Sequence, residues 1–223
     1  MNTSKDDLSV LSNKAVEQGR LDIIQFIHEN GYPFNKDMCH IAAKNGHREC
    51  LKYLYENGCP WDNKTCFMAA WNGHLECLKY AHKNGCPCNE QTCIYATLSG
   101  QFECLKYLYE NKCPWDKRTC ENAAWNGHLN CLKYAHENGC HWDKDTCSEA
   151  AQNGHFNCLK YAHENGCSWD ENTCFEAARN GHLNCLRYAH ENGCPLNKET
   201  YNIAIKNGNI DCLEYIQKII VLE

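Results

Sequence analysis

The sequence has no long hydrophobic run, no excess of basic charge and only five prolines in 223 residues. No apolar stretch approaches the roughly 18 to 20 residues that span a bilayer, and the polar start, Met1–Leu8, lacks the apolar region of a secretion signal. The net charge is −6, and the basic residues are spread along the chain without the concentrated stripe that phosphate binding requires. We therefore expect a cytoplasmic protein that binds neither membranes nor nucleic acid.

The features of an enzyme are also missing. The sequence contains no glycine loop that would cradle a phosphate, and no pair of carboxylates is set apart from its repeating pattern. Catalytic residues would interrupt a repeat, and the interruptions found here are mostly apolar. We expect no enzymatic activity and no cofactor.

The sequence does contain a strict period. One series of glycines recurs every 27 residues: Gly19, Gly46, Gly73, Gly100, Gly127, Gly154, Gly181 and Gly208. The other six glycines share a second column, in which Lys112 fills the one gap, and all five prolines share a third. The chain is therefore one short unit repeated eight times.

Units of this kind contact only their neighbours, so we expect one elongated domain rather than several separate cores. The predicted domain covers residues 1–223. It consists of an N-terminal capping repeat (1–34), six internal repeats (35–196) and a C-terminal capping repeat (197–223).

Each unit contains the signals of two short helices. Asp62 is a natural N-cap for a first helix of about nine residues. The second helix follows from His74 and ends at Gly85, with Leu75 and Leu78 on one apolar stripe. A connection of about four residues then leads to the next helix, which must lie antiparallel. Because neither helix is long enough to be stable alone in water, each unit must bury its apolar face against the next.

Two short motifs recur from unit to unit. Residues 65–70 are Thr-Cys-Phe-Met-Ala-Ala, and residues 72–78 are Asn-Gly-His-Leu-Glu-Cys-Leu. They resemble the Thr-Pro-Leu-His-x-Ala-Ala and Asn-Gly-His-Leu-Glu-Val-Val motifs of the ankyrin repeats, and the similarity extends over roughly residues 8–218. The resemblance implies an all-α fold, a right-handed helix-turn-helix solenoid of about eight 27-residue repeats.

The chain departs from the ankyrin pattern in length. The usual ankyrin unit has about 33 residues, and the missing residues fall between Gly58 and Thr65, where ankyrins build a β-hairpin finger. We therefore expect the fingers to be absent or vestigial. The recurring segment Cys-Leu-Lys-Tyr-Ala-His-Glu-Asn-Gly-Cys is similar to the cysteine-rich short ankyrin arrays of giant viruses of amoebae and of some amoebal hosts. That resemblance implies a viral protein in the host cytoplasm.

Twenty cysteines are the most unusual feature of the composition, and nineteen of them lie in three columns. In the ankyrin resemblance these columns are packing positions, so we interpret the cysteines as small buried hydrophobic side chains. The alternative is a thiol-rich protein that binds metal or buffers redox state, which would require reactive, exposed thiols. His74 and Cys77 lie on one helical face, yet two ligands do not complete a tetrahedral site. We expect no metal site.

Information about a partner should lie where the repeats differ while the backbone stays the same. Two columns of the first helix differ most, and because they are four residues apart they share one face. The ankyrin resemblance places this face on the concave side of the array. The central units carry apolar and aromatic side chains there, with charged residues on either side. The predicted partner-binding residues are Phe67, Met68, Trp71, Ile94, Tyr95, Leu98, Trp125 and Arg179.

The sequence thus predicts a protein-interaction scaffold that binds an unidentified protein or peptide along this stripe. The competing interpretation is that these side chains only fill gaps between neighbouring first helices. We expect a monomer, with the apolar end Ile219–Leu222 as a candidate site of self-association.

Overall fold

The computed structural model describes residues 5–220, with side chains described over residues 9–219. Within this range the chain forms sixteen helices and no strand, so the predicted all-α fold without β-hairpin fingers is confirmed there. The helices are α1 (Lys5–Glu17), α2 (Leu21–Glu29), α3 (Asp37–Lys44), α4 (Arg48–Glu56), α5 (Asn63–Trp71), α6 (Leu75–Lys83), α7 (Glu90–Leu98), α8 (Phe102–Glu110), α9 (Lys117–Trp125), α10 (Leu129–Glu137), α11 (Lys144–Gln152), α12 (Phe156–Glu164), α13 (Glu171–Arg179), α14 (Leu183–Glu191), α15 (Lys198–Asn207) and α16 (Ile210–Ile220). None of them combines the length and the apolar character needed to cross a membrane.

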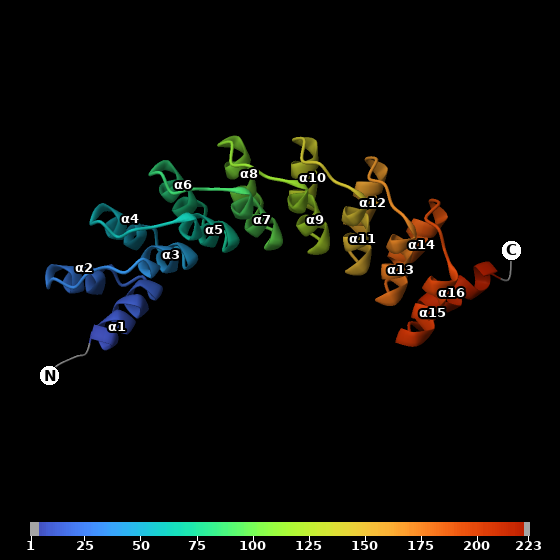
Figure 1. Cartoon of the computed structure of the whole chain (residues 1–223), viewed down its shortest axis with the longest axis horizontal. Coiled ribbons are helices and arrows are strands. Elements are labelled where there is room, and N and C mark those ends of the chain that lie inside the picture. Colours follow the sequence, from blue (N-terminus) through green and yellow to red (C-terminus); the bar gives the residue numbers. More distant parts are fainter. Residues whose placement is uncertain (1–4, 221–223) are drawn as a thin grey trace. The chain divides into compact units, whose positions relative to one another are not determined.

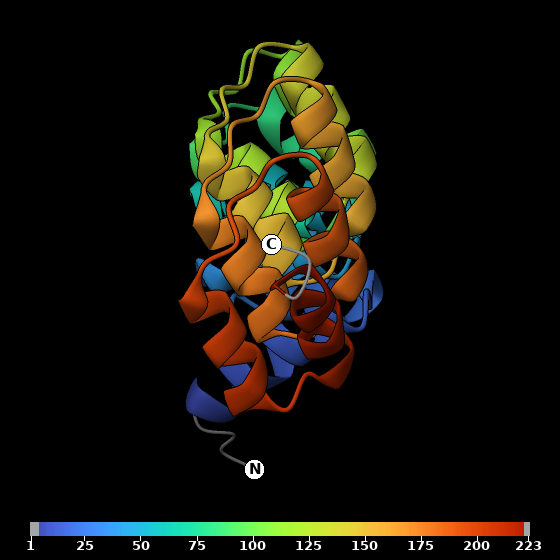
Figure 2. The same cartoon turned by 90° about the vertical axis from the view of Figure 1, so that its right-hand side faces the viewer.

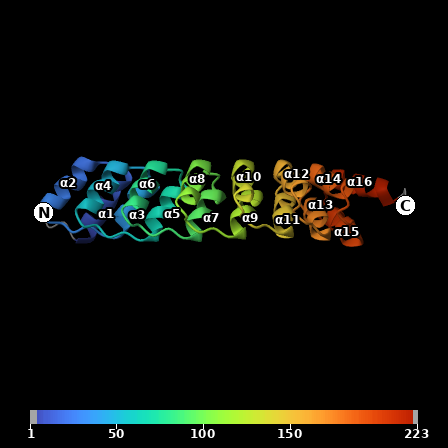
Figure 3. The same cartoon turned by 90° about the horizontal axis from the view of Figure 1, so that it is seen from above.

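The helices form two compact units, residues 1–115 with α1–α8 and residues 116–223 with α9–α16. In each unit the odd-numbered helices pack side by side in one layer, and the even-numbered helices pack in a second layer (Figures 1 and 3). Figure 2 views the second unit from its C-terminal end, with its last helix pair nearest the viewer. We call the odd-numbered helices first helices and the even-numbered ones second helices. The single domain and its two capping repeats stay a prediction.

Capping residues place the helix ends where the sequence predicts them. The carboxylate of Asp62 accepts a hydrogen bond of 2.9 Å from the amide of Lys64, and α5 begins at the residue in between. The second helix, α6, ends one residue before Asn84, and Gly85 follows in the left-handed region with φ 84°. The connection to the next pair spans residues 84–89, longer than the predicted four, because Asn84 and Gly85 already lie outside the helix.

Small and branched side chains form the core between the two layers. Each internal first helix buries alanine at one or both positions of its Ala-Ala column, as Ala69 and Ala70 do, and this allows neighbouring first helices to approach closely. The second helices bury leucine and cysteine, as in Leu132 and Cys131. No single repeat has a separate hydrophobic core, because the adjacent repeat covers the apolar stripe of each helix.

A stack of rings joins the loops of successive repeats. In the first unit, the Tyr55 ring stacks on Trp61 with a centroid distance of 3.8 Å, and Tyr80 of the next repeat meets the Trp61 ring edge-on. In the second unit, His163 stacks on Trp169 at 3.7 Å and its Nδ1 lies 3.0 Å from the hydroxyl of Tyr188. Pairs of this geometry contribute about 0.5 to 1.5 kcal/mol beyond the burial of their area. The tryptophans of this column are therefore structural.

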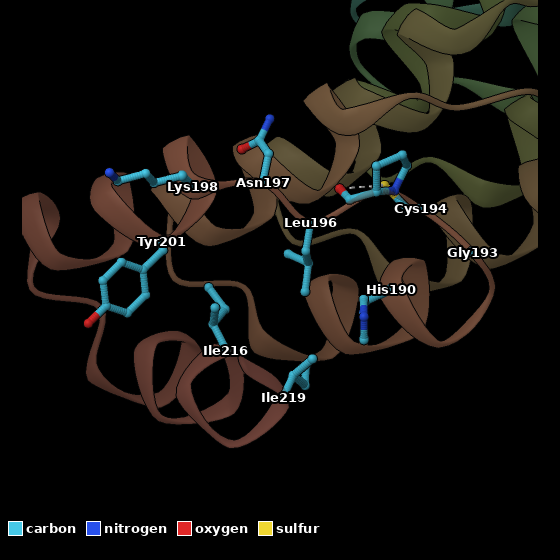
Figure 4. Close-up of a pocket in the computed structure, with 10 residues that line it drawn as sticks. His190, Gly193, Cys194, Leu196, Asn197, Lys198, Tyr201, Ile216 and Ile219 are labelled. Atoms are coloured by element: carbon cyan, nitrogen blue, oxygen red, sulfur yellow. Dashed lines mark hydrogen bonds between the residues drawn. The ribbon is translucent and has the colours of Figure 1, made fainter. Parts of the chain in front are cut away.

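The last repeat departs from this pattern. Leu196 replaces the tryptophan, and α16 continues to Ile220 over eleven residues, because isoleucines stand where most of the other second helices are followed by Asn-Gly. A pocket of about 420 Å³ opens here beside His190, Leu196, Tyr201 and Ile219 (Figure 4). The predicted site of self-association includes Val221 and Leu222, which lie outside the described residues, so it stays a prediction.

Four of the glycines that define the period lie against the imidazole ring of a histidine in the following repeat: Gly19, Gly46, Gly127 and Gly154. Gly154 adopts φ 72°, and a Cβ added there would lie 2.6 Å from Nδ1 of His182. Gly166, in the other glycine column, has a similar φ of 87° but no neighbouring atom within 4 Å of an added Cβ. At these four positions glycine is therefore needed for close packing as well as for backbone conformation.

We expect Gly154→Ala to destabilise the protein more than the control Gly166→Ala. In both variants alanine must adopt a left-handed backbone conformation, which lowers the free energy of unfolding by about 1 to 2 kcal/mol. Only in Gly154→Ala does the added methyl group also clash with a neighbouring side chain, which costs about 1 to 3 kcal/mol more. Urea unfolding of both variants, and of Gly154→Ala combined with His182→Ala, measures the difference. Equal losses of unfolding free energy in the two glycine variants would show that the contact with His182 does not contribute to stability.

Candidate protein interface

The first helices of the first unit carry a compact aromatic cluster. The ring of Tyr95 on α7 stacks against two rings of α5, with centroid distances of 4.8 Å to Phe67 and 4.9 Å to Trp71. The Ser99 hydroxyl donates to the carbonyl of Trp71 at 2.5 Å and to that of Tyr95 at 3.0 Å, so it ties the ends of both helices together. These contacts fix the three rings and the ends of α5 and α7 relative to one another.

Exposure distinguishes the members of this surface. Trp71 leaves 43% of its surface exposed although its ring is stacked. The other predicted residues of the first unit are half-buried: Phe67, Met68, Ile94, Tyr95 and Leu98. Part of their area therefore fills the space between neighbouring first helices, as the competing interpretation proposed, and the remainder lies on the surface beside Trp71.

The second unit presents a different surface at the same positions. Trp125 on α9 is 39% exposed, whereas the columns around it turn acidic. Arg179 on α13 is exposed and lies 3.3 Å from Glu176, which is 92% buried. On α11, burial together with the charges of Asp145, Glu121 and Glu176 raises the pKa of Glu149. The structure therefore places the predicted residues in two groups, six in the first unit and Trp125 and Arg179 in the second.

One group of carboxylates within the described residues has the spacing of possible metal ligands. Oxygen atoms of Glu121, Asp143 and Asp145 lie within 4.8 Å of one another. The ammonium group of Lys117 occupies this position already, at 2.8 Å from Asp143 and 3.0 Å from Glu121. Of the histidines that the sequence pairs with cysteines, His47 is engaged elsewhere, since its Nε2 lies 3.0 Å from the carbonyl oxygen of Glu17.

Nineteen of the twenty cysteines are buried, and Cys88 is half-buried. The loop column does more than pack, because its thiols donate to the N-cap carbonyl of the first helix in the same repeat, as Cys140 does to Asp116 at 3.1 Å. Sequence reasoning missed this role, although the constant spacing of 24 residues between the two partners was a usable signal.

Burial also raises the pKa of the second-helix thiols, to about 11 for Cys77 and about 12 for Cys131. These thiols are protonated and shielded, unlike those of a redox buffer.

The fold and this arrangement agree with a comparison to known families. The family model of ankyrin repeats in three copies matches residues 12–92, 66–146 and 147–220. The chain belongs to the ankyrin-repeat family. Ankyrin repeats generally mediate protein–protein interaction, and they form the helix-turn-helix array seen here. The specific resemblance to arrays of amoebal viruses stays a prediction.

A solved ankyrin structure shows the same fold. The crystal structure of the human ASB11 ankyrin repeat domain is similar with a TM-score of 0.66 and 21% sequence identity, over 74% of this chain and 90% of that one. At this identity the similarity concerns the ankyrin fold alone. No curated protein matches the sequence.

The buried thiols of this ankyrin array predict a loss of stability in alkali. An unfolded cysteine ionises near pH 8.5, whereas Cys131 in the folded chain holds its proton to about pH 12. Because the unfolded chain then binds fewer protons, stability falls as the pH rises from about 8.5 toward 12. At pH 7.5 we expect the free energy of unfolding of Cys131→Ala to be about 1 kcal/mol lower than that of the native chain. At pH 9.5 this difference should nearly vanish, because only the native chain loses stability when the unfolded Cys131 ionises.

Urea unfolding under reducing conditions at the two pH values measures this change. Leu132→Ala is the control, since it removes a buried side chain that does not titrate. If Cys131→Ala is less stable than the native chain by the same amount at both pH values, the raised pKa of Cys131 is contradicted.

Proposed function

We propose that this chain is a non-enzymatic scaffold that binds a partner protein or peptide through the exposed face of its first helices. In the first unit the proposed contact residues are Phe67, Met68, Trp71, Ile94, Tyr95 and Leu98. In the second unit they are Trp125 and Arg179.

The exposure of Trp71 is the observation that carries this proposal. Tryptophans of the loop column have a packing role in the fold, because Trp61 and Trp169 stack on neighbouring rings. Trp71 lies outside that column, on a first helix, with 43% of its surface exposed. Large aromatic side chains held rigidly on a surface are the residues that dominate protein interfaces.

The shape of the patch favours a protein segment over a small molecule. Phe67 and Trp71 lie one helical turn apart on α5, and Ile94 and Leu98 repeat this spacing on the adjacent α7. The result is two parallel rows of apolar side chains. A helix or an extended peptide presents its own apolar side chains at spacings that match such rows.

The test is a capture experiment from eukaryotic cytosol with immobilised native chain and variants. We expect Trp71→Ala/Leu98→Ala to retain at least about tenfold less of the captured protein, because truncation of a hot spot costs about 2 kcal/mol or more. Adding Trp125→Ala tests the contribution of the second unit. Phe26→Ala is the matched control, since Phe26 is an aromatic residue of the same unit, 66% exposed, on the second helix α2.

All variants must first show the helicity of the native chain by circular dichroism. Retention of the same proteins by the native chain and by Trp71→Ala/Leu98→Ala would mean that the first-helix patch is packing surface only. An equal loss of captured protein with Phe26→Ala would mean that capture depends on non-specific hydrophobic binding.

A further inference from the structure

Cys88 breaks the repeat pattern with a reactive side chain. It stands in the column that otherwise holds only apolar and mostly aromatic residues: Phe34, Trp61, Trp115, Trp142, Trp169 and Leu196. All twenty cysteines lie within the described residues, and Cys88 is the one that is not fully buried. A small thiol, accessible from the surface, therefore replaces a large ring at this position.

A second break lies on the other side of the helix pair α7–α8. Lys112 fills the gap in the glycine column, and it keeps the left-handed backbone of that column with φ 61°. The next residue is Cys113. Strained backbone of this kind concentrates at functional sites, so the loop that contains Cys113 is unusual in its backbone as well as in its contacts.

The contacts of Cys113 differ from those of the equivalent loop cysteines, which are Cys59, Cys86, Cys140, Cys167 and Cys194. Their sulfur atoms lie 3.0 to 3.3 Å from the carbonyl oxygen 24 residues earlier, whereas the Cys113 sulfur lies 3.6 Å from that of Asn89. The hydrogen-bond partners of Cys113 include the thiols of Cys88 and Cys93. Cys113 therefore has a neighbouring thiol in the aromatic column, where the other repeats have none.

Thiol pairs of similar geometry occur elsewhere in the array, but they are shielded. Cys66 and Cys86 are also hydrogen-bond partners, and they are only 0% and 2% exposed. Cys113 itself is 4% exposed. Because Cys88 is half-buried, it is the point at which a small oxidant reaches a thiol that already has a second thiol beside it.

We propose that Cys88 and Cys113 are a modification site, a thiol pair that closes to a reversible disulfide when the protein meets hydrogen peroxide. The Cys88 sulfur attacks the O–O bond of the peroxide, which gives a sulfenic acid, and the thiol proton leaves with the hydroxide as water. The Cys113 sulfur then attacks the Cys88 sulfur, so that the S–S bond forms, the S–O bond breaks and a second water leaves. The two thiols lose two electrons, and one peroxide becomes two waters.

The bond would change the connections around α7 and α8. It would join the segment just before α7 to the loop just after α8, and it would replace the hydrogen bond from Cys113 to the carbonyl of Asn89. Reduction by a dithiol would restore both thiols. This inference is independent of the proposed binding of a partner.

The chemistry of the pair predicts slow closure that speeds up in alkali. The hydrogen bond with Cys113, together with burial, raises the pKa of the Cys88 thiol. Both thiols are therefore protonated at neutral pH, and the thiolate is the form that reacts. We expect the rate of disulfide formation to rise about tenfold for each pH unit between about pH 7 and pH 9.

The test is oxidation of the full-length, fully reduced chain with hydrogen peroxide at about pH 8. The remaining thiols are blocked with N-ethylmaleimide after unfolding, and the protein is digested without reduction for mass spectrometry. We expect a cross-link between the peptides of Cys88 and Cys113 as the main product, with the other eighteen of the twenty cysteines blocked. Dithiothreitol should remove the cross-link.

Three variants test the assigned roles, after circular dichroism has shown the helicity of the native chain. Cys88→Ser removes the accessible thiol, and we expect no cross-link and an unoxidised Cys113. Cys113→Ser blocks the second step, so that dimedone should trap a sulfenic acid on Cys88. Cys86→Ser is the matched control, since it removes one thiol two residues from Cys88 and should form the cross-link as the native chain does.

The site is refuted if Cys88 and Cys113 stay thiols under peroxide, or if cross-links spread over several other pairs. A cross-link of Cys113 to Cys93, or one that forms only in urea, also contradicts it. Loss of the cross-link in Cys86→Ser would mean that the reaction depends on the total number of thiols. Because no partner protein is used, none of these outcomes depends on the capture experiment.

Discussion

Burial of each short helix against the neighbouring repeat is the interaction on which everything else in this chain depends. Most of the helices have only nine residues, too few to be stable alone in water. The residues that supply this burial recur in the internal repeats, from the alanines of the first helices to the leucines and cysteines of the second. The contacts of His182 with Gly154 and of Tyr188 with Trp169 connect one repeat to the next in the same way. These columns have little freedom to change.

Positions outside these columns are free to differ, and on the first helices the two units differ in chemistry. The first unit places Phe67, Trp71 and Tyr95 in a stacked cluster, and the second has Glu121, Trp125 and Glu149 in the same framework. One backbone thus carries an apolar surface and an acidic one. A repeat array acquires specificity in this way, because side chains on a common face change while the packing that supports them does not.

Much of this architecture was predictable from local chemistry. Asp62 caps α5 and Gly85 follows α6 where the sequence placed them, since caps and left-handed glycines act over a few residues. Features that depend on the packing of one helix or loop against another were not predictable. The bond from Cys140 to the carbonyl of Asp116 requires that carbonyl to be in place, and the raised pKa of Glu149 depends on where its neighbours point. The sequence analysis assigned Trp71 to the partner-binding surface, and the structure adds that its ring stacks on Tyr95 while 43% of its surface is exposed.

The central claim is that the first helices bind the partner while the loop column holds the array together. Oxidative footprinting of the tryptophans, with and without the protein that the native chain captures, tests this claim most directly. The account predicts that the partner protects Trp71 from oxidation and leaves Trp61 and Trp115 of the loop column unchanged. Protection of Trp61 and Trp115 with unchanged oxidation of Trp71 would contradict it, because the binding surface would then lie on the loops.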